Sequence, residues 1–247
     1  MSLAEQIASW IRQQVEDAGL NGAIVGLSGG IDSATVAGLA AHGLGSERVL
    51  GVIMPAHSHA DDVEHAKLVA RTFNLETLTI DLAQPFDLLM SLLPDGSQLA
   101  TANVKPRLRM LTLYHVANTR GLMVVGTGNR TELMVGYFTK YGDGGVDVLP
   151  LGALYKRDVR KVAAEIGVPE VIIARPPSAG LWAGQTDEEE LGITYDELDG
   201  ILDALDHGDV SGFPDERVAK VQRLIAGSAH KRRPAPIFEP KAQIETE

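Results

Sequence analysis

Residues 26–40 read GLSGGIDSATVAGLA, and they carry the apolar run AIVGL (23–27) directly into a helical pattern. A buried strand that turns sharply into a helix points backbone N–H groups and the positive end of the helix at one spot. Glycines in such a turn let a ligand approach the backbone without meeting a Cβ atom. This stretch therefore predicts an anion site at the edge of an α/β sheet.

Short apolar runs rich in β-branched residues recur along the first half of the chain and predict buried parallel strands. These strands are expected at 23–27, 48–55, 75–81 and 121–127. Apolar residues at helical spacing lie between them, and the helices are expected at 32–42, 61–73 and 107–119. Strand alternating with helix predicts an α/β fold, a doubly wound, mostly parallel sheet with helices on both faces.

The remaining segments predict helices around this sheet. An amphipathic helix opens the chain and ends at Gly19, another lies near 156–166, and helical periods recur in 194–205 and 215–227. Two stretches are expected to form mobile loops, at 84–103 and 176–192. We expect one domain over residues 1–247 with a C-terminal helical elaboration.

Composition and charge restrict the function. The net charge is −11, which argues against a nucleic-acid partner because phosphate backbones are bound by an excess of Lys and Arg. No stretch reaches the ~18 apolar residues of a membrane helix, and the first residues do not resemble a signal peptide, so no membrane partner and a cytoplasmic location are expected. The sequence contains no cysteine, which excludes disulfides, thiolate metal sites and cysteine nucleophiles.

The glycine loop differs from other phosphate-binding motifs. It lacks the lysine of the Walker G-x-x-x-x-G-K-[ST] pattern and the spacing of the dinucleotide G-x-G-x-x-G motif. Asp32 stands where phosphate would lie, and a carboxylate beside polyphosphate requires a divalent cation between them. The loop thus indicates Mg²⁺-pyrophosphate binding. A plain glycine turn with a helix cap is the structural alternative.

The S-G-G-x-D-S pattern resembles the signature of the ATP pyrophosphatases, the PP-loop family that cleaves ATP between its α and β phosphates. Further blocks are similar to those of the NAD synthetases, in the same order over most of the chain. These blocks are NVKPRLRM (103–110), the segment 126–156 from GTGNRTE to LYK, RPPSAG (175–180), DEEELGITYDELD (187–199) and HKRRP (230–234). The resemblance implies a Rossmann-like, adenine nucleotide alpha hydrolase-like fold.

The resemblance also implies roles for individual residues. Those at ATP are Gly26, Leu27, Ser28, Gly29, Gly30, Ile31, Asp32, Ser33, Thr127, Lys156 and Ser178. Those at the deamido-NAD substrate are Arg107, Lys140, Asp147, His230 and Lys231. Asp32 and Glu132 correspond to the metal ligands, and these two with Lys156 to the catalytic residues. Ser178 stands where many relatives have Thr, which preserves the hydroxyl.

Each of these residues also has a plain structural reading. Glu132 could be a helix-start carboxylate stabilised by the helix dipole. Lys140, Lys156 and Arg107 could be surface charges, and His230 and Lys231 a basic helix end.

The implied reaction is the amidation of deamido-NAD (nicotinic acid adenine dinucleotide) by ammonia, at the expense of ATP and with Mg²⁺. The family resemblance further implies a homodimer. Glutamine-using relatives need an amidase with a cysteine nucleophile, and the absence of cysteine predicts that this chain uses ammonia itself. A separate glutaminase partner remains open.

Three other functions share parts of the pattern. A tRNA-thiolating ATP pyrophosphatase would carry cysteines or a basic RNA surface, and a GMP-synthetase-like core would lack the FTKYGDGGVD block (138–147). A nucleotide-binding signalling module on the same sheet would have no reason for Glu132 and Lys156 to accompany Asp32.

Overall fold

A parallel sheet forms the centre of the computed structural model, which describes residues 1–178, 180, 182 and 184–238. Its strands are β1 (Gly22–Gly26), β2 (Val49–Ile53), β3 (Glu76–Thr79) and β4 (Leu122–Val124). They form a four-stranded sheet in the order β3-β2-β1-β4, and each neighbouring pair is parallel. The predicted parallel sheet and its strand positions are confirmed.

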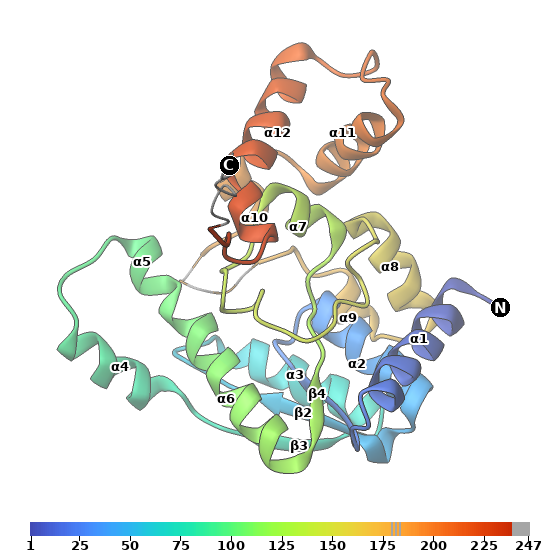
Figure 1. The fold of residues 1–247 in the computed structure, drawn as a ribbon, viewed down its shortest axis with the longest axis vertical. Coiled ribbons are helices and arrows are strands. Elements are labelled where there is room, and N and C mark those ends of the chain that lie inside the picture. Colours follow the sequence, from blue (N-terminus) through green and yellow to red (C-terminus); the bar gives the residue numbers. More distant parts are fainter. Residues whose placement is uncertain (179, 181, 183, 239–247) are drawn as a thin grey trace, which may run out of the picture.

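Helices follow or precede every strand (Figure 1). Those packed around the sheet are α1 (Leu3–Asp17), α2 (Ile31–Leu44), α3 (Ala60–Thr72), α6 (Val104–Arg120), α8 (Lys156–Glu165) and α9 (Glu170–Ile173), and α4 (Ala83–Leu92) and α5 (Gln98–Ala102) contact α6. The remaining helices are α7 (Arg130–Val135), α10 (Asp187–Leu191), α11 (Tyr195–His207) and α12 (Asp215–Gly227). Two 3₁₀ turns are η1 (Ser46–Arg48) and η2 (Ala229–Arg232). None of the helices in the described part of the chain combines the length and apolar character that a bilayer crossing requires.

The strands β1 and β2 are buried, as the sequence predicts, whereas the edge strand β3 is mostly exposed, so the expectation of a buried strand is wrong there. In β1, Ala23 and Val25 point into a core shared with α1, α2 and α3. Ile24, between them, points into a second core shared with α6. Because side chains alternate across a strand, a continuous apolar strand must have helices on both sides. The doubly wound architecture is therefore confirmed.

The segment 84–103 was expected to be a loop, and that expectation is wrong, because it contains most of α4 and all of α5. Pro85 lies in the first turn of α4, where the missing N–H group is not needed. Leu82 and Phe86 bury their side chains, with Leu82 in the core under α6. In the other expected loop, 176–192, α10 occupies the C-terminal end, and residues 179, 181 and 183 lie outside the described residues.

The C-terminal helices form a third packed cluster, away from the sheet (Figure 1). Apolar side chains of α11 and α12 pack there against Val135 of α7 and Tyr155 just before α8. The predicted helices at 194–205 and 215–227 are confirmed. This cluster reaches the sheet through α7 and α8, and both of these helices begin at the site described below.

The strand order reverses next to β1. From β1 the chain adds β2 and β3 on one side, and it then returns to place β4 on the other side. In open α/β sheets a crevice forms beyond the carboxyl ends of the strands at such a switch point, and ligands bind there. The loop after β1 and the loop after β4 therefore lie on either side of the expected binding crevice.

Candidate active site

The loop between β1 and α2 is held by its own serines. Ser28 Oγ and Ser33 Oγ lie 3.0 Å apart, and the Ser33 hydroxyl donates to the carbonyl of Gly30 at 3.0 Å. The Gly30 N–H donates to Ser28 Oγ at 3.2 Å. These bonds fix a tight turn at the start of α2. Gly30 is the N-cap of that helix and has no side chain to accept the first N–H groups, so this helix end stays available to an anion.

Gly29 and Gly30 of this loop are needed for different structural reasons. Gly29 has φ +82°, and a Cβ atom there would lie 2.4 Å from the carbonyl oxygen of Asp62 in α3. Gly30 borders the cavity, and a Cβ there would meet only Ser28 Oγ at 3.3 Å. Gly30 therefore leaves the backbone open to the cavity, whereas Gly29 is required by backbone conformation and by the close approach of α3.

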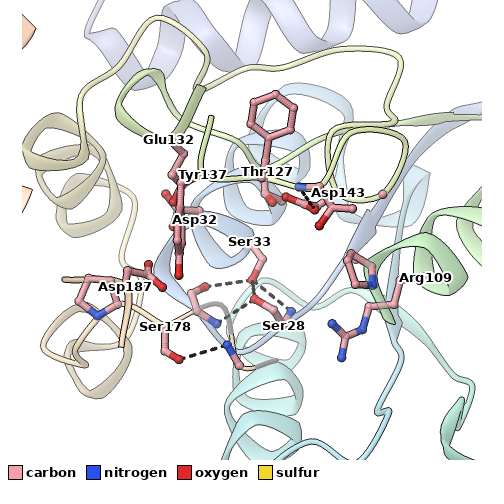
Figure 2. A pocket seen from close by; sticks show the side chains of 18 of the residues that line it. Ser28, Asp32, Ser33, Arg109, Thr127, Glu132, Tyr137, Asp143, Ser178 and Asp187 are labelled. Atoms are coloured by element: carbon pink, nitrogen blue, oxygen red, sulfur yellow. Dashed lines mark hydrogen bonds between the residues drawn. The ribbon is translucent and has the colours of Figure 1, made fainter. Parts of the chain in front are cut away.

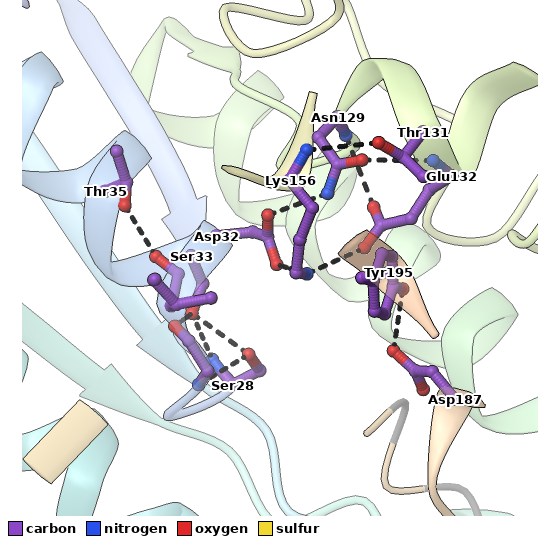
Figure 3. A network of polar contacts seen from close by, with 12 residues as sticks. Ser28, Asp32, Ser33, Thr35, Asn129, Thr131, Glu132, Lys156, Asp187 and Tyr195 are labelled. Atoms are coloured by element: carbon purple, nitrogen blue, oxygen red, sulfur yellow. Dashed lines mark hydrogen bonds and ion pairs between the residues drawn. The ribbon is translucent and has the colours of Figure 1, made fainter. Parts of the chain in front are cut away.

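Three charged side chains from different parts of the chain meet beside this loop (Figure 3). The Lys156 ammonium donates to Asp32 Oδ2 at 2.5 Å and to Glu132 Oε1 at 3.1 Å. The Lys156 side chain is only 3% exposed, and the carboxylates are 18% and 16% exposed. The surface-charge reading of Lys156 is therefore wrong. Asp32 lies in the first turn of α2, Glu132 in that of α7, and Lys156 begins α8.

Asn129 ties the two acidic residues together. Its side-chain amide donates to Asp32 Oδ1 at 2.9 Å, and its Oδ1 accepts the backbone N–H of Glu132 at 3.0 Å. Glu132 Oε2 in turn accepts the Asn129 N–H at 3.3 Å, which completes a capping box at the start of α7. The helix-start reading of Glu132 is thus correct for one oxygen, while the other oxygen faces Lys156. The N-x-x-E spacing in GNRTE was a sequence signal for Asn129.

Burial and the neighbouring charges both shift the pKa values of Glu132 and Lys156. Burial raises the pKa of Glu132 to about 7, and the Asp32 carboxylate adds to the increase against the opposing effect of the Lys156 ammonium. Burial alone would lower the pKa of Lys156, but the two carboxylates outweigh it and the pKa is raised. Lys156 therefore stays protonated, and its ammonium forms ion pairs with both carboxylates.

A cavity of about 900 Å³ opens onto this group and onto the glycine loop (Figure 2). The predicted site residues that line it are Gly26, Leu27, Ser28, Gly30, Ile31, Asp32, Ser33, Thr127, Glu132, Lys156, Ser178 and Lys231. Ser178 also lines the cavity, and its hydroxyl donates to the carbonyl of Gln185 at 2.7 Å. The fold thus brings the predicted ATP and metal residues to one cavity, apart from Gly29, which packs against α3.

Most residues predicted at the dinucleotide lie beside the cavity and are bound to backbone. Arg107 donates to the carbonyl of Lys140 at 3.4 Å, and Lys140 Nζ donates to the carbonyls of His230 and Arg233 at 2.7 and 2.9 Å. Lys231 Nζ reaches the cavity wall and donates to the carbonyls of Gly136 and Phe138 at 2.7 and 2.9 Å. These residues form one basic cluster where the HKRRP segment docks.

Asp147 stands apart from that cluster. Its Oδ1 accepts the hydroxyl of Tyr114 at 2.8 Å, and its Oδ2 accepts the backbone N–H of Val124 at 2.8 Å. Both contacts fasten the segment after the GDGG turn to β4 and α6. In this structure Asp147 therefore acts as an anchor.

The structure adds cavity residues that sequence reasoning missed. Arg109 lines the cavity and donates to the carbonyl of Met54 at 3.1 Å, whereas Arg107 of the same helix does not line it. Two positions on a helix point about 200° apart, so only one of the two arginines can face inward. Asp143 of the GDGG turn also lines the cavity and accepts the N–H of Thr139 at 2.9 Å. Desolvation within the cavity raises the pKa of its carboxyl, although the residue keeps an exposed surface.

The two carboxylates beside Lys156 suit a hard cation. Asp32 and Glu132 offer carboxylate oxygens, which Mg²⁺ prefers. In the part of the chain that the structure describes, no three or more His, Cys, Asp or Glu side chains gather as a metal cluster. A cation here would thus have two protein carboxylates and would need further oxygens from a ligand, as Mg²⁺-polyphosphate provides.

Comparison with known proteins decides the family. A sequence profile described as NAD synthase matches residues 3–235. The chain belongs to the NAD synthase family. An NH(3)-dependent NAD(+) synthetase of Archaeoglobus fulgidus is 48% identical over 95% of this chain and 95% of its own.

Two solved structures of related synthetases share the fold. The NMN synthetase of Francisella tularensis matches with a TM-score of 0.88 and 34% identity over 96% of this chain and 97% of its own. The NH3-dependent NAD synthetase of Campylobacter jejuni, in complex with nitrate, matches with a TM-score of 0.84 and 28% identity over 96% and 98%. Membership of the NAD synthase family confirms the resemblance seen in the sequence and rules out the thiolating, GMP-synthetase-like and signalling alternatives.

Proposed function

We propose that this chain is an ammonia-dependent NAD synthetase, a ligase that converts deamido-NAD, ATP and ammonia into NAD, AMP and pyrophosphate. The observation that carries the proposal is the buried Lys156 ammonium between Asp32 and Glu132, in the cavity that the S-G-G-I-D-S loop also lines. The match of the family over 3–235 supports reading residues 1–247 as one catalytic unit.

The chemistry follows from what a carboxylate needs to become an amide. The nicotinate carboxylate is anionic and its oxygen leaves poorly, so it first attacks the α-phosphorus of ATP and expels pyrophosphate. This step builds negative charge on the phosphate oxygens. Lys156 and the residues at the start of α2 line the same cavity, and we propose that the ammonium and the N–H groups stabilise that charge.

We propose Asp32 and Glu132 as ligands of Mg²⁺. When bound, Mg²⁺ would neutralise phosphate charge and orient the pyrophosphate leaving group. The ion would also stabilise the ionised form of Glu132, whose pKa is raised to about 7 by burial. Ser28, Ser33, Thr127 and Ser178 are proposed to donate hydrogen bonds to ATP from the surrounding walls, where all four side chains lie.

In the second step ammonia attacks the carbonyl carbon of the acyl-adenylate, and AMP leaves. The attacking nitrogen must lose a proton, and the Asp143 carboxylate lines the same cavity and has a raised pKa. We propose Asp143 as the group that accepts this proton. The reactive anhydride must be kept from water, and Leu99 of α5 with the cavity-lining residues 176–178 and 184–187 are proposed to serve that purpose.

The basic cluster beside the cavity is proposed to bind the dinucleotide. Lys140 and Lys231, with Arg107, bring positive charge to one rim of the cavity beside the His230 backbone, which suits the phosphates of deamido-NAD. In this arrangement Asp147 contributes through its anchoring of the GDGG segment. Binding would require Lys140 and Lys231 to exchange backbone carbonyls for substrate oxygens.

We also propose a homodimer, as the family resemblance implies. Five leucines on or next to α4, α5 and α6 expose their apolar side chains to solvent. These are Leu88, Leu92, Leu93, Leu99 and Leu111. A second copy of the chain would cover them next to the cavity wall to which Leu99 contributes.

A second acceptor is favoured by one observation. The structure with a TM-score of 0.88 is an NMN synthetase, so the same architecture serves a protein named for a mononucleotide product. The corresponding reaction here would amidate nicotinic acid mononucleotide by the same two steps.

One experiment tests both acceptors. The purified chain is incubated with ATP, Mg²⁺ and ammonium, and with deamido-NAD or nicotinic acid mononucleotide, and the products are separated by liquid chromatography. We expect NAD from deamido-NAD with a kcat/KM at least tenfold above that for the mononucleotide. The reverse preference would support NMN synthesis, and no amide from either acceptor would refute the proposed function.

A further inference from the structure

The N-terminal end of α11 packs against the side chain of Lys156, although this helix begins 39 positions later in the sequence. Tyr195, the first residue of α11, places its ring 5.0 Å from Lys156 Nζ (Figure 3). Tyr195 is 1% exposed, and its hydroxyl donates to Asp187 Oδ2 at 3.0 Å. An aromatic face attracts an ammonium most strongly where water is absent. The ring therefore supplies a fixed, uncharged surface against which the ammonium rests.

The same helix also holds the backbone at Lys156. Asp199 accepts the backbone N–H of Arg157 at 2.8 Å and the hydroxyl of Thr131 at 2.5 Å. The Thr131 hydroxyl in turn accepts the backbone N–H of Lys156 at 3.1 Å. Both Asp199 and Thr131 are fully buried. One carboxylate thus joins the first turn of α8, which carries Lys156, to the first turn of α7, which carries Glu132.

Tyr195 and Asp199 both lie on one face of α11. They are four positions apart, so they project from the same side of α11. Other residues of α11 already pack it onto the protein, since Leu198, Ile201 and Leu202 are buried in the C-terminal cluster. A buried carboxylate and a buried tyrosine hydroxyl add little to stability, because each loses water to gain its partners. Their placement is explained better by the group they surround.

We infer that Tyr195 and Asp199 are positioning residues for Lys156, with Tyr195 fixing its ammonium and Asp199 fixing its backbone. This inference rests on the proposed function, in which Lys156 stabilises charge that develops as pyrophosphate leaves. Interactions realised in the transition state affect kcat rather than ground-state binding. Loss of positioning should therefore lower kcat and leave the KM values for ATP and the acceptor within about twofold.

The kinetic test compares four variants of the full chain at a temperature well below their unfolding midpoints. Tyr195→Leu removes the ring, Tyr195→Phe keeps the ring and removes the hydroxyl, and Asp199→Asn keeps the shape and removes one acceptor. Asp196→Asn is the matched control, because Asp196 lies on the same helix but its side chain is 83% exposed beside Arg160.

We expect Tyr195→Leu to lower kcat about 10- to 30-fold and Asp199→Asn to lower it about tenfold. Tyr195→Phe should stay within about threefold of the original chain, since it keeps the ring under the ammonium, and Asp196→Asn should be unchanged. A purely structural role would lower the midpoint of thermal unfolding and leave kcat of the folded enzyme intact. That result for Tyr195→Leu would overturn the inference.

A crystal structure of Tyr195→Leu separates this inference from the proposed function. We expect Lys156 Nζ to move beyond 4 Å from Asp32 or Glu132. If Nζ still contacts both carboxylates, the inference is overturned whatever the kinetics. If the original chain forms no amide product, the proposed function fails, and the position of Nζ in this crystal structure decides the inference by itself.

Discussion

Lys156 Nζ lies 2.5 Å from Asp32 Oδ2, although 124 positions separate the two residues in the sequence. Asp32 arrives at the end of β1 and Lys156 after the loops that follow β4, so the contact forms where the strand order reverses. Water has little access to this ion pair, because the side chains of Lys156 and Asp32 are 3% and 18% exposed. A charge held in this way would need no reorganisation to stabilise the phosphate charge that the proposed reaction develops.

The products of ATP cleavage test the reading of the glycine loop. Because the loop lacks the Walker lysine and presents Asp32, we expect cleavage between the α and β phosphates. AMP and pyrophosphate should appear in a one-to-one ratio with the amide product, measured by chromatography and a pyrophosphate assay. ADP and orthophosphate as primary products would contradict the assignment.

The carboxylates Asp32 and Glu132 should be required for turnover. Asp32→Asn and Glu132→Gln each remove a charge that the proposed Mg²⁺ site needs, so we expect kcat to fall at least a hundredfold. Circular dichroism should show an unchanged fold. Glu76→Gln is a suitable control, since Glu76 forms an exposed pair with Arg120. A variant at Asp32 or Glu132 that kept most of its activity would show that the residue is no ligand.

Removal of the Lys156 ammonium should affect stability in a way that Mg²⁺ reverses. Lys156→Met leaves two partly buried carboxylates without their cation, and we expect the free energy of unfolding to fall by about 2–3 kcal/mol. Excess Mg²⁺ should restore part of this loss, because it binds the folded state.

Thermal unfolding with and without Mg²⁺ measures the effect. Lys161→Met is the matched control, because Lys161 lies on the same helix and is 75% exposed in its pair with Asp158. Equal unfolding midpoints for Lys156→Met and Lys161→Met, with no response to Mg²⁺, would argue against a cation site between Asp32 and Glu132.

The nitrogen source should be ammonia, because the chain contains no cysteine for a glutamine amidase. Only neutral ammonia has the lone pair for attack. If amide formation limits the rate, kcat/KM for total ammonium should therefore rise about tenfold per pH unit well below the ammonium pKa, until another group titrates. Glutamine should give no product in an ammonia-free assay. Product from glutamine with no second protein present would require an amidase site without cysteine.

The exposed leucines of α4 should control assembly. Leu88 and Leu92 are 64% and 75% exposed, and replacing both by Asp would put charge into the proposed interface. We expect light scattering after gel filtration to show a dimer for the original chain and a monomer for the double variant. Val171→Asp, on the 54% exposed position of α9, should remain dimeric. A monomeric original chain would refute the proposed dimer.

Sequence alone determined the sheet, its helices and the glycine loop, because these depend on local patterns. The apolar runs at 23–27 and 48–55 had to become buried strands, and S-G-G-I-D-S at the end of the first one had to form the turn into α2. The run at 75–81 also became a strand, but at the sheet edge it is mostly exposed. The motif comparison also brought together Asp32, Glu132 and Lys156 as one set. What it missed locally was the helical character of 84–103, where leucine periodicity and an early proline are compatible with α4.

Only the tertiary structure decided which partner each of these residues meets. Arg109 rather than Arg107 faces the cavity because the rotation of α6 is fixed by its packing on the sheet. Asp147 became an anchor of β4, and Tyr195 and Asp199 came to surround Lys156. Such contacts join segments that are distant in the sequence, and no periodicity records them. They are set by how the C-terminal helices pack against the starts of α7 and α8.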